Sequence, residues 1–250
     1  MKKRSTQRAR PKPRAVQARP IGRDRAWAPS LESMRTLIER AELRLNAEQL
    51  EQLWRFDQLL RARNHDRDLT RLIEFEAVVV KHYIDSMFVG RLIELPSPLC
   101  DVGTGAGFPG IPLKIRYPHV SMVLAEQRPR RIEFLNEAIR ALNLARVETF
   151  KQRVVSRSFT TPMRGVITRA VEPIAKTVLR TSGCTQVGSR IIFMKGPNVD
   201  EELEQAMRQF GGEFQLVLDR AYMLPHTHHA RRLIVLERTA PPVPERAGED

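Results

Sequence analysis

Apolar residues follow two different spacings along the chain, and the change falls near residue 98. From Ser30 to about residue 97, apolar positions recur at the spacing of a helix face. Beyond residue 98, short apolar runs typical of buried strands alternate with amphipathic stretches. The last two such runs flank a loop with proline and histidine. We therefore expect an α/β fold: a small helical N-terminal part, then a doubly wound parallel sheet that ends in an antiparallel hairpin.

These spacings predict individual elements. One helix starts at Ser30 and a second covers Ala47–Arg63; the polar stretch RNHDRDLTRL interrupts the pattern, which resumes as a helix in EFEAVVVKHYIDSMFVGRLIEL. Further on, we expect helices at Ile111–Arg116 and Arg128–Leu142 and strands at 98–102, Ser121–Ala125, Val147–Phe150, Gly165–Thr168, Arg190–Met194, Glu213–Leu218 and Arg232–Glu237. The chain thus divides into a disordered tail (1–28), a helical N-terminal part (29–97), an α/β domain (98–239) and a flexible C-terminal tail (240–250).

Composition indicates a globular protein of the cytoplasm. The chain of 250 residues is 42% hydrophobic, enough for a sizeable core. No apolar run approaches the roughly 20 residues that span a bilayer, so we expect no membrane association. The two cysteines, Cys100 and Cys184, make no disulfide framework, which suits a reducing compartment. We expect Cys100 to be buried in a strand and Cys184 to lie in a loop or turn.

The positive charge is concentrated at the N-terminus. The net charge is +13, and residues 1–25 carry ten of the 42 lysines and arginines with a single acid, Asp24. Such a segment buries too little apolar surface to fold on its own. It is suited to binding nucleic-acid phosphates, but a solubilising extension and an organelle transit peptide have the same composition.

The stretch LCDVGTGAGFPGIPLKI (99–115) is the clearest chemical signal. Gly105, Gly107 and Gly110 fit G-x-G-x-x-G, the dinucleotide-binding pattern. Asp101 and Gly103 extend it to D-x-G-x-G-x-G, which many S-adenosylmethionine methyltransferases carry after their first strand. In both classes the glycines let the backbone approach a ligand closely. A tight turn without a ligand is a third possibility.

Neighbouring residues favour S-adenosylmethionine. Pro109 and Pro112 remove N–H donors that a pyrophosphate would use at the helix start. Asp101 is unhelpful to a pyrophosphate but favours a cationic ligand. Glu126, at the end of the next strand, suits ribose hydroxyls in either class. A nicotinamide-dependent oxidoreductase remains the alternative enzyme.

Residues from about 45 to 238 resemble the glucose-inhibited division protein B family of bacterial 16S ribosomal RNA (guanine-N7) methyltransferases. The motif DVGTGAGFPGIPLKI carries the resemblance, supported in family order by DLT, KHYIDS, RRIEFL, TRAVEPI, FMKG and RRLIVLE. The resemblance implies a Rossmann-like class I methyltransferase fold and S-adenosylmethionine as methyl donor. It also implies a specific guanine of 16S rRNA, in the small ribosomal subunit, as acceptor.

The resemblance also assigns cofactor contacts. They fall on Gly103, Phe108, Val154, Val155 and Arg169. The glycine motif adds Asp101, Gly105 and Gly107 as expected cofactor contacts, and the end of the next strand adds Glu126. The sequence departs from the family at three positions: Glu126 replaces Asp, Asp68 replaces the Asn before LT, and Val155 replaces an acid.

The implied reaction needs no general base, because guanine N7 has a free lone pair; orientation and desolvation suffice. We expect Arg169 and Lys195, each just after a strand, to line the base pocket as the catalytic residues. Arg153, Arg231 and Arg232 are candidates for contacts with RNA phosphates. A non-catalytic RNA-binding or assembly factor on the same fold is the second alternative.

Two histidine-containing stretches leave their roles open. His82 and Asp85 share a helix face and either close over the cofactor or make a structural hydrogen bond. His226, His228 and His229 are closely spaced but have no cysteine or acid nearby, so we expect a polar loop and no metal site. We expect the protein to be a monomer.

Overall fold

The computed structural model describes residues 27–169 and 171–241. The predicted basic tail therefore lies outside the described residues, except for Trp27 and Ala28. Of the predicted C-terminal tail, only Ala240 and Pro241 are described.

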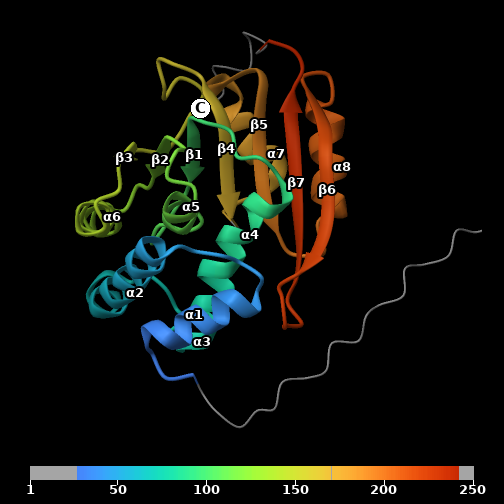
Figure 1. Cartoon of the computed structure of the whole chain (residues 1–250). Coiled ribbons are helices and arrows are strands. Elements are labelled where there is room, and N and C mark those ends of the chain that lie inside the picture. Colours follow the sequence, from blue (N-terminus) through green and yellow to red (C-terminus); the bar gives the residue numbers. More distant parts are fainter. Residues whose placement is uncertain (1–26, 170, 242–250) are drawn as a thin grey trace, which may run out of the picture.

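A seven-stranded sheet organises the molecule, with strand order β3-β2-β1-β4-β5-β7-β6 (Figure 1). Strands β1 to β5 pair in parallel, and β7 runs antiparallel between β5 and β6. The strands are β1 (Leu99–Val102), β2 (Met122–Ala125), β3 (Val147–Phe150), β4 (Met163–Arg169), β5 (Thr185–Lys195), β6 (Phe214–Met223) and β7 (Ala230–Arg238). The doubly wound sheet and its antiparallel hairpin are confirmed.

Helices cover both faces of this sheet. The helices of the α/β part are α5 (Gly110–Arg116), α6 (Pro129–Ala141), α7 (Ile174–Thr181) and α8 (Asp200–Phe210), with a 3₁₀ turn η2 (Ser182–Cys184). Apolar residues of α7 and α8 form one core with one sheet face, whereas α5 and α6 contribute to the core on the other. The strand order reverses between β1 and β4, the point where α/β folds bind ligands.

The N-terminal part is helical, as predicted. Its elements are α1 (Leu31–Arg40), α2 (Ala47–Arg67), α3 (Phe75–Val78), a π-helical turn η1 (Val79–Ile84) and α4 (Asp85–Leu92). The Ser30 side chain caps α1 by accepting from Ser33 N at 3.0 Å. Asn46 and Gln49 form a capping box at the start of α2.

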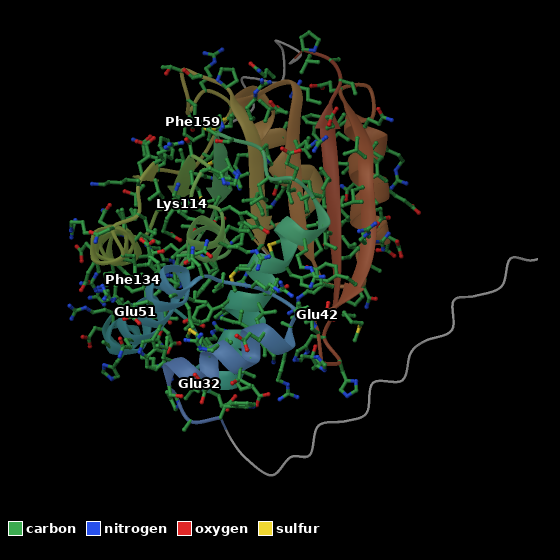
Figure 2. All side chains as sticks on the ribbon, viewed as in Figure 1. Glu32, Glu42, Glu51, Lys114, Phe134 and Phe159 are labelled. Atoms are coloured by element: carbon green, nitrogen blue, oxygen red, sulfur yellow. The ribbon has the colours of Figure 1, made fainter. Side chains whose placement is uncertain are left out.

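This helical part shares one core with the sheet. Phe56 of α2 lies 5.7 Å, centre to centre, from the ring of Phe108 and 6.0 Å from that of Phe134. Figure 2 labels Phe134 on α6, beside α2. The same apolar cluster contains Met34 of α1 and Ile192 of β5. The N-terminal helices are therefore packed as part of the α/β body.

Several predicted boundaries are wrong. Helix α2 continues past Arg63 to Arg67, because basic side chains suit a helix C-terminus and Asn64 Oδ1 accepts from Leu69 N and Thr70 N just beyond it. Strand β5 begins earlier than predicted, at Thr185, which pairs in parallel with Met163 of β4. Strands β6 and β7 are longer than predicted, because their outer ends are held by antiparallel pairing with each other and lack a continuous apolar run. The predicted helix over EFEAVVVKHYIDSMFVGRLIEL contains the π-helical turn η1.

Both cysteines are buried; Cys100 lies in β1 and Cys184 in the turn η2, as expected. Within residues 27–169 and 171–241, no helix combines the length and apolar character needed to cross a bilayer.

Candidate active site

Two pockets lie at the carboxyl ends of the parallel strands. The first, which we call the glycine-loop pocket, has a volume of about 170 Å³. It is lined by Val102, Gly103, Ala125, Glu126, Gln127, Gln152, Arg153, Val154, Val171, Glu172 and Arg180. The second, the arginine pocket, has a volume of about 380 Å³. It is lined by Leu72, Lys81, His82, Asp85, Arg169, Met194, Lys195, Gly196 and Arg231.

Gly103 begins the glycine loop directly after β1. Its φ of +71° is in the left-handed region that favours glycine. A Cβ added there would lie 2.7 Å from Cγ2 of Val171, a residue of the pocket wall. Gly103 N donates to Ala125 O at 3.0 Å, which fixes the loop against β2. The backbone at Gly103 is thus held open toward a ligand.

Asp101 lies beneath the loop. Its Oδ2 accepts from Thr104 Oγ1 at 2.6 Å and from Gly110 N at 2.8 Å. Its Oδ1 has no hydrogen-bond partner among the described residues. Burial raises the pKa of Asp101 to about 6. Asp101, Gly105 and Gly107 are not among the residues that line the pocket, so their cofactor contacts stay a prediction.

Glu126 ties the glycine loop to the end of β2. Its Oε2 accepts from Gly105 N at 3.1 Å. Its Oε1 accepts from Gln127 N at 2.8 Å and from Arg128 N at 2.9 Å. Carboxylate oxygens have lone pairs for further donors, so Glu126 retains the capacity to accept from ribose hydroxyls.

The far wall of this pocket is formed by the segment after β3. Val154 lines it, whereas Val155 lies outside the lining and donates from its backbone N to Ser158 Oγ at 2.8 Å. Arg180 donates to Val154 O at 3.1 Å and is paired with Glu172. The sequence interpretation missed Arg180 and Glu172, because an ion pair across eight positions has no signature in spacing.

Arg169 and Lys195 both line the arginine pocket; that this pocket binds the base stays a prediction. Arg169 donates from Nη1 to Lys81 O at 2.9 Å, and its guanidinium lies 5.3 Å from the ring centre of Phe108. Lys195 Nζ donates to Glu172 O at 2.8 Å and to Glu202 Oε2 at 2.7 Å. Arg169 is not among the residues lining the glycine-loop pocket, so its predicted cofactor contact remains untested.

His82 of the arginine pocket contacts the glycine loop through its ring. It stacks on Phe108 of the glycine loop with a centre separation of 4.3 Å. Burial and the charge of Arg169 lower the pKa of His82 to about 3, so the ring is neutral. A guanidinium only donates, so Nδ1, 3.1 Å from Arg169 Nη2, is the acceptor. The Nε2–H then donates to Thr70 Oγ1 at 2.9 Å.

Asp85 lies below the same pocket with its carboxylate buried. Its Oδ2 accepts from Arg231 Nε at 3.1 Å and lies 3.8 Å from Arg169 Nη1. Its Oδ1 lies 3.5 Å from the donating hydroxyl of Tyr222. Burial raises the pKa of Asp85, and Arg231 and then Arg169 oppose that rise. His82 and Asp85 therefore both make hydrogen bonds, one of the two roles left open by the sequence.

The three arginines that are candidates for contacts with RNA phosphates lie at different places in the structure. Arg231 lines the arginine pocket and Arg153 lines the glycine-loop pocket. Arg232 pairs with Asp219 and Asp200, each at 2.6 Å. Which of them bind RNA phosphates stays a prediction.

The remaining sequence signals lie nearby. The turn between β6 and β7 carries the three closely spaced histidines, and no group of three potential metal ligands occurs in the described part of the chain. The Asp68 side chain is 84% exposed, and its carbonyl accepts from Arg131 Nη2 at 2.8 Å. Arg131 also lies 3.9 Å from Glu126 Oε2. The motif RRIEFL, which contains Arg131, supports the family resemblance, but the sequence did not predict that Arg131 lies beside the glycine loop.

Comparison with known proteins identifies relatives over most of the chain. The family model GidB, described as rRNA small subunit methyltransferase G, matches residues 49–234. "Ribosomal RNA small subunit methyltransferase G 2" of Syntrophobacter fumaroxidans is 45% identical over 215 residues, which cover 86% of this chain and 43% of that protein. The chain therefore spans less than half the length of this relative.

Other relatives are matched over most of their own length. A Bdellovibrio bacteriovorus protein with the same description is 43% identical over 79% of this chain and 77% of its own. "Ribosomal RNA small subunit methyltransferase G" of Lactiplantibacillus plantarum is 32% identical over 84% of this chain and 90% of its own. Among solved structures, the magnesium protoporphyrin IX methyltransferase of Synechocystis, determined with bound S-adenosylmethionine, superposes with a TM-score of 0.52. It is 13% identical and covers 74% of this chain and 97% of its own, a likeness in fold alone.

Proposed function

The chain belongs to the rRNA small subunit methyltransferase G family, and on that premise we propose that it transfers the methyl group of S-adenosylmethionine to N7 of a specific guanine in 16S rRNA. The observation that carries the proposal is a direct contact between the linings of the two pockets. Lys195 of the arginine pocket donates from Nζ to the carbonyl oxygen of Glu172 in the glycine-loop pocket at 2.8 Å. Phe108, which belongs to the loop that starts at Gly103, also stacks on His82 of the arginine pocket. A donor in the first pocket and a base in the second would thus be neighbours.

The residues of the glycine-loop pocket fit S-adenosylmethionine. A Cβ at Gly103 would meet Cγ2 of Val171 at 2.7 Å, so glycine is needed for the loop to lie this close to the pocket wall. Glu126 has free acceptor capacity for the ribose hydroxyls, and Val154 offers the adenine an apolar contact. When bound, S-adenosylmethionine supplies a methyl group on a sulfonium, which guanine N7 accepts without losing a proton. The glycine loop and Glu126 then have only to hold and orient it.

The arginine pocket suits a guanine. Arg169 and Lys195 are donors for guanine O6, the commonest basis of guanine recognition by protein cations. The carboxylates near it are engaged, Asp85 by Arg231 and Glu202 by Lys195, so no free general base faces the pocket among these residues. A reaction at N7 needs none.

We place the reaction on the small ribosomal subunit in the cytoplasm, with the protein acting as a monomer. The names of the relatives point to rRNA of that subunit. The basic residues 1–25 would add affinity for the RNA, although they lie outside the described residues.

The test is methyl transfer from radiolabelled S-adenosylmethionine to small ribosomal subunits and, separately, to naked 16S rRNA. We expect label in 16S rRNA that is released as 7-methylguanosine on digestion. Titrations with S-adenosylmethionine and with NAD run alongside. Binding of NAD without S-adenosylmethionine would establish the oxidoreductase alternative. Tight subunit binding without any transfer would establish the assembly factor.

A further inference from the structure

One buried carboxylate balances the cations of the arginine pocket. Among the described residues that line the pocket, Lys81, Arg169, Lys195 and Arg231 are cations, and Asp85 is the only carboxylate. Lys195 has its own partner outside the pocket, Glu202. Asp85, by contrast, lies between Arg231 at 3.1 Å and Arg169 at 3.8 Å.

The geometry of Asp85 also sets where the two arginines point. Its Oδ2 faces both guanidinium groups, which approach from β4 and β7, while Tyr222 of β6 donates to its Oδ1 at 3.5 Å. Arg169 is further held by Lys81 O and His82 Nδ1. Without the carboxylate, two partly buried like charges would face each other at the pocket floor. Such pairs repel strongly where water is excluded.

The proposed reaction makes this charge balance matter. The lone pair of guanine N7 forms the new N–C bond as the C–S bond breaks, and sulfur keeps the electron pair of that bond. No proton moves. The positive charge therefore leaves the sulfonium and appears on the guanine. A pocket of unbalanced cations would oppose this step, whereas a carboxylate behind them lowers the local potential.

We propose that Asp85 is a positioning residue for the methyl transfer: it orients Arg169 and Arg231 and supplies the negative charge that lets the bound guanine become cationic. This inference rests on the proposed function. Asp85 acts through the two arginines and does not itself touch the base. Its effect should therefore appear in the rate of transfer and in the affinity for the methylated product more than in the binding of unmethylated RNA.

The chain offers a matched control in Asp57. Like Asp85, it is a buried aspartate on a helix, with an arginine and a tyrosine hydroxyl as partners: Arg61 at 2.7 Å and Tyr83 at 2.9 Å. Asp57 lines neither pocket. Asp57→Asn and Asp85→Asn therefore remove equivalent buried charges, but only Asp85→Asn alters the arginine pocket.

The experiment measures three quantities for wild type, Asp85→Asn and Asp57→Asn. They are kcat for methyl transfer at saturating subunit, the affinity for S-adenosylmethionine, and the ratio of affinities for methylated and unmethylated RNA. We expect Asp85→Asn to lower kcat by roughly 10²-fold and to shift the affinity ratio against methylated RNA, with S-adenosylmethionine binding retained. We expect Asp57→Asn to lower stability but to leave the affinity ratio of the folded protein unchanged.

An unchanged affinity ratio in Asp85→Asn, or equal losses of kcat in the two variants, overturns the proposal. If Asp85→Asn does not fold, Arg231→Gln decides, because it removes a cation and leaves the carboxylate. In Arg231→Gln, the ratio of affinities should shift in favour of methylated over unmethylated RNA. A shift of that ratio against methylated RNA overturns the proposal. Wild-type protein that transfers no methyl group refutes the proposed function itself, whereas active wild type with an unmoved ratio refutes only the role of Asp85.

Discussion

The glycine-loop pocket and the arginine pocket share one edge of the sheet, yet they are built from different kinds of contact. The first takes its lining from the ends of β1 and β2, from the segments that follow β1, β2, β3 and β4, and from α7. Backbone amides fix its loop, since Gly103 N donates to Ala125 O and Glu126 accepts from Gly105 N and Gln127 N. The second takes side chains from the loop before α3, from η1, α4, β4, β5 and β7.

A buried aspartate lies beneath each pocket, and the two are stabilised differently. Asp101, under the glycine loop, accepts from the neutral donors Thr104 and Gly110. Asp85, under the arginine pocket, accepts from a guanidinium and faces a second one. The comparison teaches that one carboxylate shapes a backbone loop while the other balances charge. The two pockets should therefore respond differently to substitution and to pH.

The largest effect is expected for Arg169→Ala. It removes the guanidinium from the arginine pocket and leaves Lys81 O and His82 Nδ1 without their donor. Methyl transfer should fall by roughly 10²–10³-fold, the usual loss for one oriented donor at a reacting group, while S-adenosylmethionine affinity is retained. Transfer assays and cofactor titration check this. The control is Arg63→Ala, because Arg63 pairs with Glu137 at 2.6 Å and lines neither pocket. Loss of cofactor affinity in Arg169→Ala would instead place Arg169 on the cofactor side.

The second prediction concerns the contribution of Asp101 to the free energy of unfolding, which should depend on pH. Its pKa in the folded protein is about 6, above the ordinary 3.8, so the folded state holds the proton more tightly than the unfolded state. The stability from this group is fully present below about pH 4 and is lost as pH rises through about 6, by up to about 3 kcal/mol. The free energy of unfolding of wild type minus that of Asp101→Asn, measured by urea unfolding, should therefore fall as pH rises over that range. A signed difference that stays constant or rises with pH would contradict the burial argument.

A smaller effect is expected for Gly103→Ala. The alanine meets both a φ of +71° and Cγ2 of Val171 at 2.7 Å, so it strains the backbone and narrows the pocket. Gly188→Ala is the matched control, because its φ is +81° and its Cβ would contact nothing within 4 Å. Both variants should lose about 1–2 kcal/mol of stability. Only Gly103→Ala should weaken S-adenosylmethionine binding. We expect a loss of affinity of roughly tenfold or more, which corresponds to about 1.4 kcal/mol or more of binding free energy. Equal cofactor affinities in the two variants would exclude Gly103 from the site.

The smallest effect is expected for deletion of residues 1–25, which lie outside the described residues. The deletion removes ten basic residues and one acid and leaves every residue that lines the two pockets in place. Subunit affinity should drop mainly at low salt, and the dependence of that affinity on salt should become shallower. Binding measured at several salt concentrations checks this. An unchanged salt dependence would favour a solubilising extension, and S-adenosylmethionine binding serves as the internal control.

Prediction from the sequence succeeded where the signal is local. The start of α1 at its Ser30 cap, the strands β1 to β4 and the glycine loop all follow from neighbouring residues. It failed at the end of α2, where a polar stretch continues the helix up to a cap by Asn64. It also shortened β6, whose outward residues are exposed and whose order depends on pairing with β7.

The amino-acid sequence by itself determined the order of the strands, the helices up to α6, the glycine loop and the placing of Glu126, Arg169 and Lys195 after strands, because each depends on residues within one or two turns of the chain. The helices α7 and α8 were not predicted. Only the tertiary structure decided that Asp101 supports the loop from below, that His82 stacks on Phe108, and that Asp85 lies between two arginines. The Asp85–Arg231 pair is separated by 146 positions. Such contacts arise from the packing of the helical part on the sheet, which no local spacing encodes.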